Sequence, residues 1–247
     1  MKSEKDESRK LVTYIPQIAV RAAGKLWQLE RAASLEQLWE AMTESDSFAD
    51  ERLPYWTELW PSSVVLSNWL EQQKNNISGR CCLDMGCGLG LTALVARSLG
   101  ASVVGMDYEF EALNHARSNA VLNAVPAPLW VVMDWRKPAV QRGRLQCIWG
   151  ADIMYEKRFV LPVIRFLEHA LTKDGIAWLA EPGRSIYDAF LDMLQSRGWQ
   201  GRAVYSETVE PLYVPSVPVP VNIWELRRPG TEPATHAMNS DNAGQDA

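Results

Sequence analysis

Three glycines at alternate positions, Gly86, Gly88 and Gly90, stand directly behind the short apolar run of residues 81–85. Glycine inside a strand or a helix is destabilising, so three of them this close together indicate backbone that turns with a positive φ or lies against a ligand. The apolar residues within 91–99 recur at helical spacing. The stretch therefore predicts a strand, a glycine turn and a helix, in that order.

The same succession of strand, turn and helix recurs along the chain from residue 80. Helical spacing of apolar residues follows most of the predicted strands. Beyond the first, these strands are predicted over 101–107, 127–135, 145–152 and 175–183. Such alternation predicts a parallel sheet with helices on both faces. The last two apolar runs, 201–210 and 219–228, have no helix between them and predict an antiparallel hairpin at one edge. The fold class is therefore α/β, a Rossmann-like doubly wound sheet.

Composition shifts at both ends of the chain predict segments outside this fold. The charged residues 1–10 predict a disordered leader, and the polar residues 229–247 predict a disordered tail. Between the leader and the fold, residues 11–53 predict an N-terminal extension of two short strands and a helix. That helix would begin at Ser34, with Gln37 three residues later as in a capping box.

The overall charge and the cysteine pattern exclude several classes of protein. A formal net charge of −5 gives no overall field that would attract nucleic acid or an anionic membrane, so neither partner is expected. No apolar run is long enough for a spanning helix, and the first ten residues are too polar for a secretion signal. The four cysteines have no zinc-site spacing, and no metal is expected. These features predict a cytoplasmic protein.

Acidic side chains accompany three successive predicted strands. Asp84 precedes the glycines, Asp107 ends the second strand, and Asp134 with Trp135 ends the third. Ligands of open parallel sheets bind at the carboxyl ends of the strands. Asp107 could there accept both hydroxyls of a ribose, while Asp134 and Trp135 could bind and cover an adenine. Asp84 suits a ligand with a positively charged end, so the set favours a sulfonium nucleoside. For each acid alone, a turn or helix cap is an equal alternative.

A dinucleotide cofactor is less well supported by the glycine pattern, because position 91 is Leu where a third spaced glycine is wanted. The stretches "LDMGCGLG" and "GMD", together with the terminal hairpin, instead resemble the class I, seven-strand S-adenosylmethionine-dependent methyltransferases over residues 54–228. The resemblance implies the strand order 3-2-1-4-5-7-6, with strand 7 antiparallel. It also implies S-adenosyl-L-methionine as the cofactor.

Three further stretches narrow the resemblance. "PYWTELWPSS" (54–63) and "GADIMY" (150–155) are similar to segments of the lysine methyltransferase branch of this class. Together with "EPGR" (181–184), these stretches are most similar to the electron-transfer-flavoprotein β-subunit lysine methyltransferases. The resemblance implies a protein substrate that presents a lysine as the methyl acceptor.

The resemblance and the acids together give the expected site. Cofactor-binding residues are expected at Trp60, Asp84, Gly86, Gly88, Gly90, Asp107, Asp134, Trp135 and Ala151. The expected catalytic pair is Asp152 and Tyr155. Methyl transfer from a sulfonium depends mostly on alignment, so Asp152 is assigned to holding the acceptor amine and Tyr155 to walling the pocket.

The residues leave several alternatives open. Asp152 could instead cap a helix, and Tyr155 could serve only in packing. Whether Asp152 also takes a proton from the amine is open as well. Glu58 and Arg184 could line the substrate entrance, or Arg184 could satisfy backbone carbonyls. The whole protein could also be a methyltransferase for a small amine or hydroxyl, or a nucleoside-binding protein without chemistry.

Overall fold

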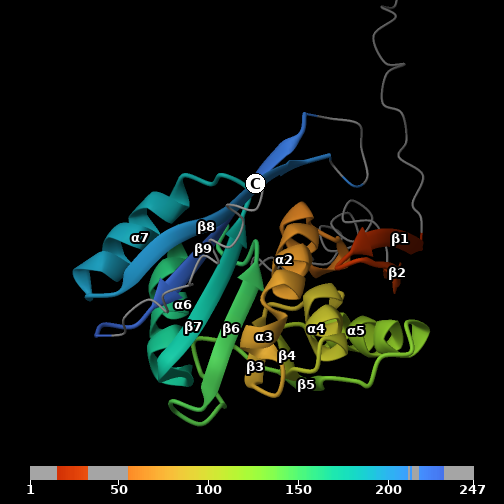
Figure 1. The fold of residues 1–247 in the computed structure, drawn as a ribbon, viewed down its shortest axis with the longest axis horizontal. Helices are drawn as coiled ribbons and strands as arrows, with labels where there is room; N and C mark the ends of the chain where they lie inside the picture. Colours follow the sequence, from red (N-terminus) through yellow and green to blue (C-terminus); the bar gives the residue numbers. More distant parts are fainter. Residues whose placement is uncertain (1–15, 33–54, 211, 213–216, 231–247) are drawn as a thin grey trace, which may run out of the picture.

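The computed structural model describes residues 16–32, 55–210, 212 and 217–230. Its centre is a seven-stranded sheet in the order β5-β4-β3-β6-β7-β9-β8 (Figure 1). The strands are β3 (Cys81–Met85), β4 (Ser102–Asp107), β5 (Leu129–Val132), β6 (Leu145–Ala151), β7 (Leu171–Glu181), β8 (Gln200–Val209) and β9 (Val219–Arg227). β9 runs antiparallel to both of its neighbours, β7 and β8, and the other six strands of this sheet share one direction. The predicted order, fold class and terminal hairpin are confirmed.

Helices cover both faces of the sheet. On one face lie α2 (Pro61–Gln72), α4 (Leu91–Ser98) and α5 (Phe110–Leu122), and on the other lie α6 (Lys157–Ala170) and α7 (Ile186–Ser196). Two shorter helices are η1 (Tyr55–Thr57) and α3 (Lys74–Ile77). Because both faces are covered, the central strands are apolar almost throughout. In β7, residues 176–180 are all buried.

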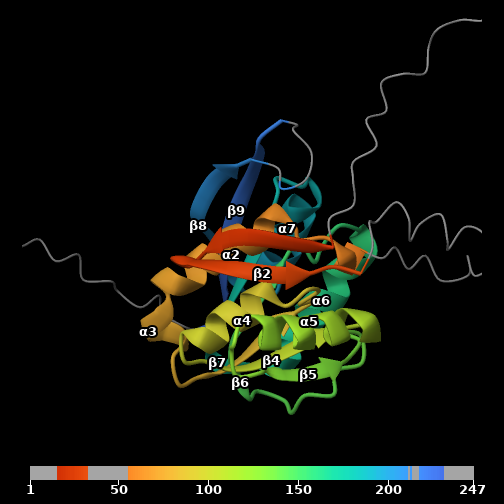
Figure 2. The ribbon, with the colours of Figure 1, turned by 90° about the vertical axis from the view of Figure 1, so that its right-hand side faces the viewer.

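A second, two-stranded sheet lies over the helices of the first face (Figure 2). It consists of β1 (Gln17–Ala22) and β2 (Lys25–Glu30), the two short strands predicted around Gly24. Asn119 of α5 and Asn123, the residue that caps the C-terminus of α5, bind the free edge of β2. Asn119 Oδ1 accepts the Glu30 N–H at 2.7 Å, and Asn123 Oδ1 accepts that of Gln28 at 3.0 Å. The helix predicted from Ser34 and Gln37, the leader and most of the predicted tail lie outside the described residues.

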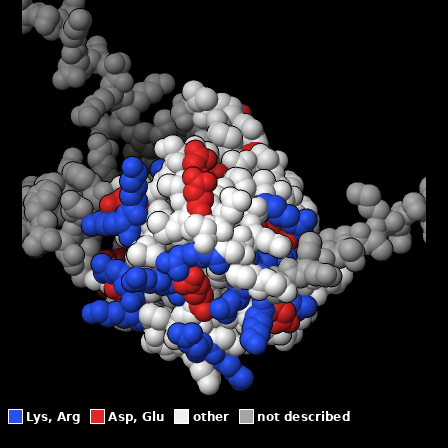
Figure 3. Space-filling view, turned by 90° about the vertical axis from the view of Figure 1, so that its left-hand side faces the viewer, with Lys and Arg blue, Asp and Glu red and all other residues white. Residues whose placement is uncertain are grey.

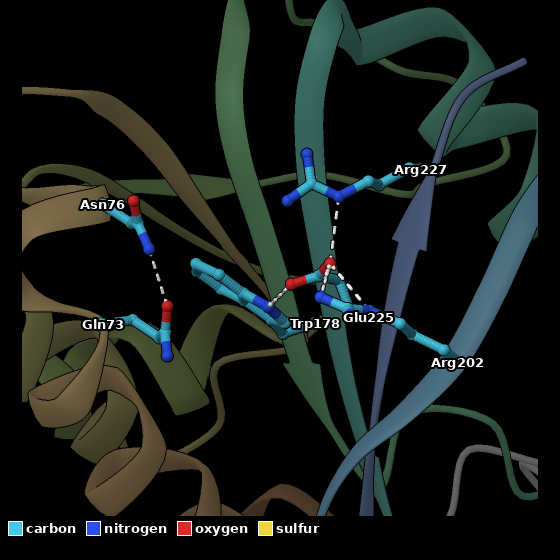
Figure 4. Close-up of polar contacts among 6 residues, drawn as sticks. All are labelled: Gln73, Asn76, Trp178, Arg202, Glu225 and Arg227. Carbon is cyan, nitrogen blue, oxygen red and sulfur yellow. Dashed lines mark hydrogen bonds and ion pairs between the residues drawn. The ribbon is translucent and has the colours of Figure 1, made fainter. Parts of the chain in front are cut away.

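A buried carboxylate ties together the three strands at the far edge of the sheet (Figure 4). Glu225 of β9 accepts hydrogen bonds from Arg202 of β8 and Arg227 of β9, both at 2.9 Å, and from the Trp178 indole of β7 at 3.3 Å. Burial acts to raise the pKa of Glu225, but the bonds from Arg227 and Arg202 outweigh it and hold the pKa below its ordinary value.

The face that carries α7 and β8 has a mixed surface charge. Lys and Arg gather there in several groups with Asp and Glu among them (Figure 3). One exposed pair joins Arg197, which follows α7, to Glu168 of α6 at 3.0 Å. Across the described ranges, 16–32, 55–210, 212 and 217–230, no helix combines the length and apolar composition that a bilayer crossing requires.

Candidate active site

A cavity of about 210 Å³ lies at the carboxyl ends of β3, β4 and β6, where ligands of open parallel sheets bind. Its walls come from five parts of the chain: η1 with the start of α2, the glycine loop after β3, the residues after β4, those after β5, and the segment between β6 and α6. Of the eleven predicted site residues, ten line this cavity: Trp60, Gly86, Gly88, Gly90, Asp107, Asp134, Trp135, Ala151, Asp152 and Tyr155.

The glycine loop turns with positive φ at all three predicted positions, 67° at Gly86, 50° at Gly88 and 88° at Gly90. At Gly90 a side chain is excluded for a second reason, because a Cβ atom there would lie 2.9 Å from the Cβ of Ala116 in α5. The missing side chain lets α5 pack directly behind the loop. The loop therefore exposes its backbone to the cavity, as the sequence predicted.

Asp107 lies under the glycine loop with both carboxylate oxygens oriented by backbone. Its Oδ2 accepts the N–H of Gly88 at 2.9 Å, and its Oδ1 accepts that of Glu109 at 3.0 Å. Burial raises the pKa of Asp107, and these bonds oppose the rise. A carboxylate has about four acceptor positions, so two bonds leave capacity for two hydroxyl groups. The residue therefore fits a ribose diol in the cavity.

Asp134 and Trp135 lie on the cavity wall. The strand that they were predicted to end is shorter, because β5 ends at Val132, and both residues follow it in the loop. The Nε of Arg136 donates to both oxygens of Asp134, at 3.0 and 2.8 Å. The Trp135 ring packs edge-on against Phe159 of α6, with the ring centres 5.5 Å apart. Trp135 thus presents a rigidly held aromatic surface, which suits a planar base.

Asp84 is the one predicted site residue that does not line the cavity. Its side chain is 1% exposed and accepts a hydrogen bond from the hydroxyl of Thr92 in α4. Burial raises the pKa of this carboxyl to about 7. The structure thus places Asp84 behind the glycine loop, joining β3 to α4, and its contact with a cationic ligand stays a prediction.

Asp152 follows β6 in a left-handed conformation, with φ 53°. Its backbone N–H donates to Ala180 O at 2.8 Å. Its two oxygens accept the Nε and Nη2 of Arg184 at 2.7 and 2.9 Å. Asp152 does not cap a helix, because α6 begins at Lys157 with Glu156 in the cap position. Arg184 follows β7, and its side chain pairs with Asp152. This pair could not be predicted from the sequence, since no spacing rule joins residues 32 apart.

A continuous row of five aromatic rings runs along the cavity beside Asp152. Its members are Trp60, Tyr55, Tyr155, Phe159 and Trp135. Successive ring centres lie 4.9 to 5.9 Å apart, all edge to face. Burial raises the pKa of Tyr155 to about 12, so its hydroxyl keeps its proton at neutral pH. Tyr55 belongs to the Tyr-Trp segment noted in the sequence, whereas Phe159 carries no sequence signal beyond its place in a helix.

Other residues at the cavity have structural partners. Glu58 lines the wall and accepts from Arg31, which follows β2, at 2.6 Å. This bond ties the N-terminal hairpin to the segment that precedes α2. Among the residues that the structure describes, no group of three or more His, Cys, Asp or Glu side chains is arranged to hold a metal ion.

Comparison with known proteins shows which family this chain matches. The model of a family described as lysine methyltransferase matches residues 50–197. An electron transfer flavoprotein beta subunit lysine methyltransferase of Danio rerio is 31% identical over 148 residues, covering 59% of this chain and 57% of its own length. The protein N-lysine methyltransferase METTL21A of Mus musculus is also 31% identical, over 144 residues, covering 56% and 66%.

A further relative is named for a ribosomal protein. A ribosomal protein L11 methyltransferase of Vibrio campbellii is 34% identical over 104 residues, covering 40% of this chain and 35% of that protein. The chain thus spans between about a third and two thirds of the length of these relatives. Among solved structures, the T. thermophilus 16S rRNA N2 G1207 methyltransferase, in complex with AdoMet and guanosine, matches with a TM-score of 0.54 at 16% identity. That match covers 86% of this chain and 50% of the other. It supports the fold alone.

Proposed function

The chain belongs to the lysine methyltransferase family, and on that premise we propose that it transfers a methyl group from S-adenosylmethionine to a lysine side chain of a partner protein. One observation carries the proposal: a single cavity holds the glycine loop and Asp107 together with Asp152 and the aromatic row. The first pair suits a nucleoside and the second suits an amine. A methyl donor and its acceptor would therefore meet inside this cavity.

At the nucleoside end, three groups would hold S-adenosylmethionine. Asp107 would accept the two ribose hydroxyls, the backbone after Gly86 would lie along the amino-acid end, and Trp135 would cover the adenine. Trp60 would close the cavity from the side of α2. Its indole is fixed by a 3.0 Å hydrogen bond to the carbonyl of Tyr55. The bound cofactor supplies an electrophilic methyl group on a positively charged sulfur.

At the amine end, alignment is the main task of the protein. The amine must present its lone pair in line with the methyl–sulfur bond, and it must have lost its extra proton. Asp152 would accept an N–H bond from the amine and fix its direction. The faces of Tyr55 and Tyr155 would stabilise the positive charge that develops on nitrogen, by cation–π attraction. Tyr155, with its pKa raised to about 12, would contribute its ring and not a base.

The names of the relatives include a flavoprotein subunit and a ribosomal protein as acceptors. We accordingly propose a lysine on a folded protein as the class of acceptor. Purified electron transfer flavoprotein β-subunit and ribosomal protein L11 are the first two acceptors to supply, beside a whole lysate from the same source.

The test is incubation of the purified protein with radiolabelled S-adenosylmethionine and these acceptors, followed by separation by size. A discrete labelled protein is expected. Asp152→Asn should abolish the labelling and still bind the cofactor. Asp188→Asn, an exposed change on α7, is the matched control and should label normally. Label that appears only in the small-molecule fraction contradicts a protein acceptor, and full labelling by Asp152→Asn contradicts the role of Asp152.

A further inference from the structure

The charge state of Asp152 presents a chemical problem for any amine acceptor. A lone carboxylate favours the ammonium form of a nearby amine, because opposite charges within 4–6 Å stabilise each other. The ammonium form has no lone pair and cannot accept a methyl group. A site that binds its acceptor through a bare carboxylate would therefore hold it in the unreactive state. Asp152, however, is not bare.

Arg184 forms a two-pronged ion pair with Asp152. The Nε and Nη2 atoms donate to separate oxygens at 2.7 and 2.9 Å, the geometry in which guanidinium and carboxylate interact most strongly. The carboxylate is only 5% exposed, whereas the guanidinium is 35% exposed. The backbone N–H of Arg184 donates to Glu181 at 2.7 Å, which fixes the loop that carries the pair. Asp152 therefore faces the cavity as half of a neutral pair.

We propose that Arg184 is a positioning residue that neutralises Asp152, so that the site binds the acceptor as an uncharged amine. This inference rests on the proposed function. The two acceptor positions that Arg184 leaves on the carboxylate can still receive an N–H of the amine. The pair thus keeps the directional hydrogen bond and removes most of the attraction for an ammonium ion. Arg184 acts through Asp152 and needs no contact with the methyl group.

Among the neighbouring ionisable groups, Arg184 is the one that neutralises the charge of Asp152. The ionisable groups that interact with the pair are Tyr55 of η1, Glu181 of β7 and Tyr187 of α7. Tyr55 in turn lies near Glu156, which precedes α6. Burial raises the pKa of both tyrosines, so they are neutral. Glu156 pairs with Arg158 at 2.8 Å.

Glu181 is buried and fully engaged, since it accepts from Arg184 N–H, Asn222 and Trp224. The guanidinium of Arg184 is hydrogen-bonded to Asp152, and Asp152 lines the cavity. Removal of Arg184 would therefore leave the acceptor facing an uncompensated negative charge.

The experiment measures the protonation of a bound amine directly and needs no identified acceptor. The probe is n-butylamine, which reproduces the end of a lysine side chain, labelled with ¹³C next to nitrogen. It is titrated by NMR against protein saturated with S-adenosylhomocysteine, and the carbon shift reports the pKa of the bound amine. In Arg184→Gln this pKa should lie about one to three units above that in the unmodified protein, as expected for an unbalanced charge at this distance. Each unit is a tenfold change in the ammonium-to-amine ratio.

Further variants separate charge from folding. Arg184→Lys keeps the positive charge and should leave the pKa of the bound amine near that in the unmodified protein. Asp152→Asn should lower it, and the double variant Asp152→Asn with Arg184→Gln should bring it back up. The last comparison tests the proposal even if Arg184→Gln alone does not fold. Arg197→Gln removes an arginine from the exposed pair with Glu168 and should change nothing.

The outcomes distinguish this inference from the function on which it rests. Failure of the unmodified protein to bind S-adenosylhomocysteine would contradict the proposed function itself. Binding of the nucleoside, with no saturable binding of n-butylamine or with the same bound pKa in all variants, would overturn only the role of Arg184. The order Asp152→Asn lowest, unmodified and double variant intermediate, and Arg184→Gln highest is the result that supports it.

Discussion

At the scale of single residues, three aspartates stand at or near the ends of successive strands, but each has a different structural environment. Asp84, Asp107 and Asp134 accompany successive strands, yet one is sealed behind the glycine loop, one is held by two backbone N–H groups, and one is bound by an arginine. The sequence placed all three at the correct edge of the sheet. All three were predicted to contact the ligand, yet Asp84 does not line the cavity, because that depends on the direction of the side chain, which the pattern does not encode.

Asp107→Ala should weaken the binding of S-adenosylmethionine by about 1.5 to 3 kcal/mol, the cost of losing charge-assisted hydrogen bonds. Isothermal titration calorimetry measures this loss. Asp188→Ala, on the surface of α7, should bind with the affinity of the unmodified protein. Unchanged affinity in Asp107→Ala would show that the ribose is not held at this position.

Asp84 should give the protein an unusual pH dependence. Its pKa in the folded state, about 7, lies above its ordinary value of 3.8. Its contribution to stability is therefore fully present below pH 3.8 and is lost as the pH rises through 7. Asp84→Asn should consequently gain stability relative to the unmodified protein between pH 4 and 8, by up to about 4 kcal/mol. Urea unfolding across this range provides the measurement, and a difference that does not vary with pH would contradict the burial of a charged group here.

At the scale of elements, α5 connects parts of the chain that are far apart in sequence. Asn119 is fully buried, and besides accepting from Glu30 its side chain donates to the carbonyl of Leu89 in the glycine loop at 3.0 Å. One side chain thus links the N-terminal hairpin to the cofactor loop. Apolar residues at helical spacing between 113 and 121 predicted this helix, but they carry no signal for the role of Asn119.

Asn119→Ala should destabilise the protein by about 1 to 3 kcal/mol, because it leaves buried backbone groups of β2 and the loop without partners. Amide hydrogen exchange should increase in β2 and around Leu89. Asn114→Ala is the matched control, since Asn114 of the same helix bonds only the side chain of Glu111 in the outer face. Equal losses in the two variants would mean that the link to the hairpin carries no stability.

At the scale of the whole molecule, the sheet holds the site at one end and is fixed at its far edge by Glu225. Loss of this carboxylate in Glu225→Gln should cost about 3 kcal/mol at pH 7, because two arginines lose their buried partner. The pKa of Glu225 is depressed, so its contribution is present above its ordinary value of 4.5 and disappears as the pH falls below that value.

The difference in unfolding free energy between the unmodified protein and Glu225→Gln should therefore be constant above pH 5 and shrink toward pH 3. Chemical denaturation at several pH values tests this. Glu168→Gln, in the exposed pair with Arg197, should show almost no effect at any pH. A cost for Glu225→Gln that persisted unchanged at pH 3 would contradict the ion pairing.

The architecture could be predicted from sequence because strand and helix periodicities are local properties. The repeated alternation of strands and helices predicted the parallel sheet, and the two apolar runs without a helix between them predicted its hairpin, whereas the strand order came from the family resemblance. The site was predictable where a strand end defines a position, as at Asp107 and Asp152. The pairing of Asp152 with Arg184 and the row of rings from Trp60 to Trp135 depend on contacts between segments distant in sequence, which no local pattern encodes.

The central claim is that the acceptor is a lysine, and its most direct test is chemical identification of the methylated residue. Protein labelled with radioactive S-adenosylmethionine would be hydrolysed completely and its amino acids separated beside methylated standards. The label is expected to elute with mono-, di- or trimethyllysine and to be missing when Asp152→Asn replaces the unmodified enzyme. Label that elutes instead with methylated arginine, histidine or glutamine would contradict the account.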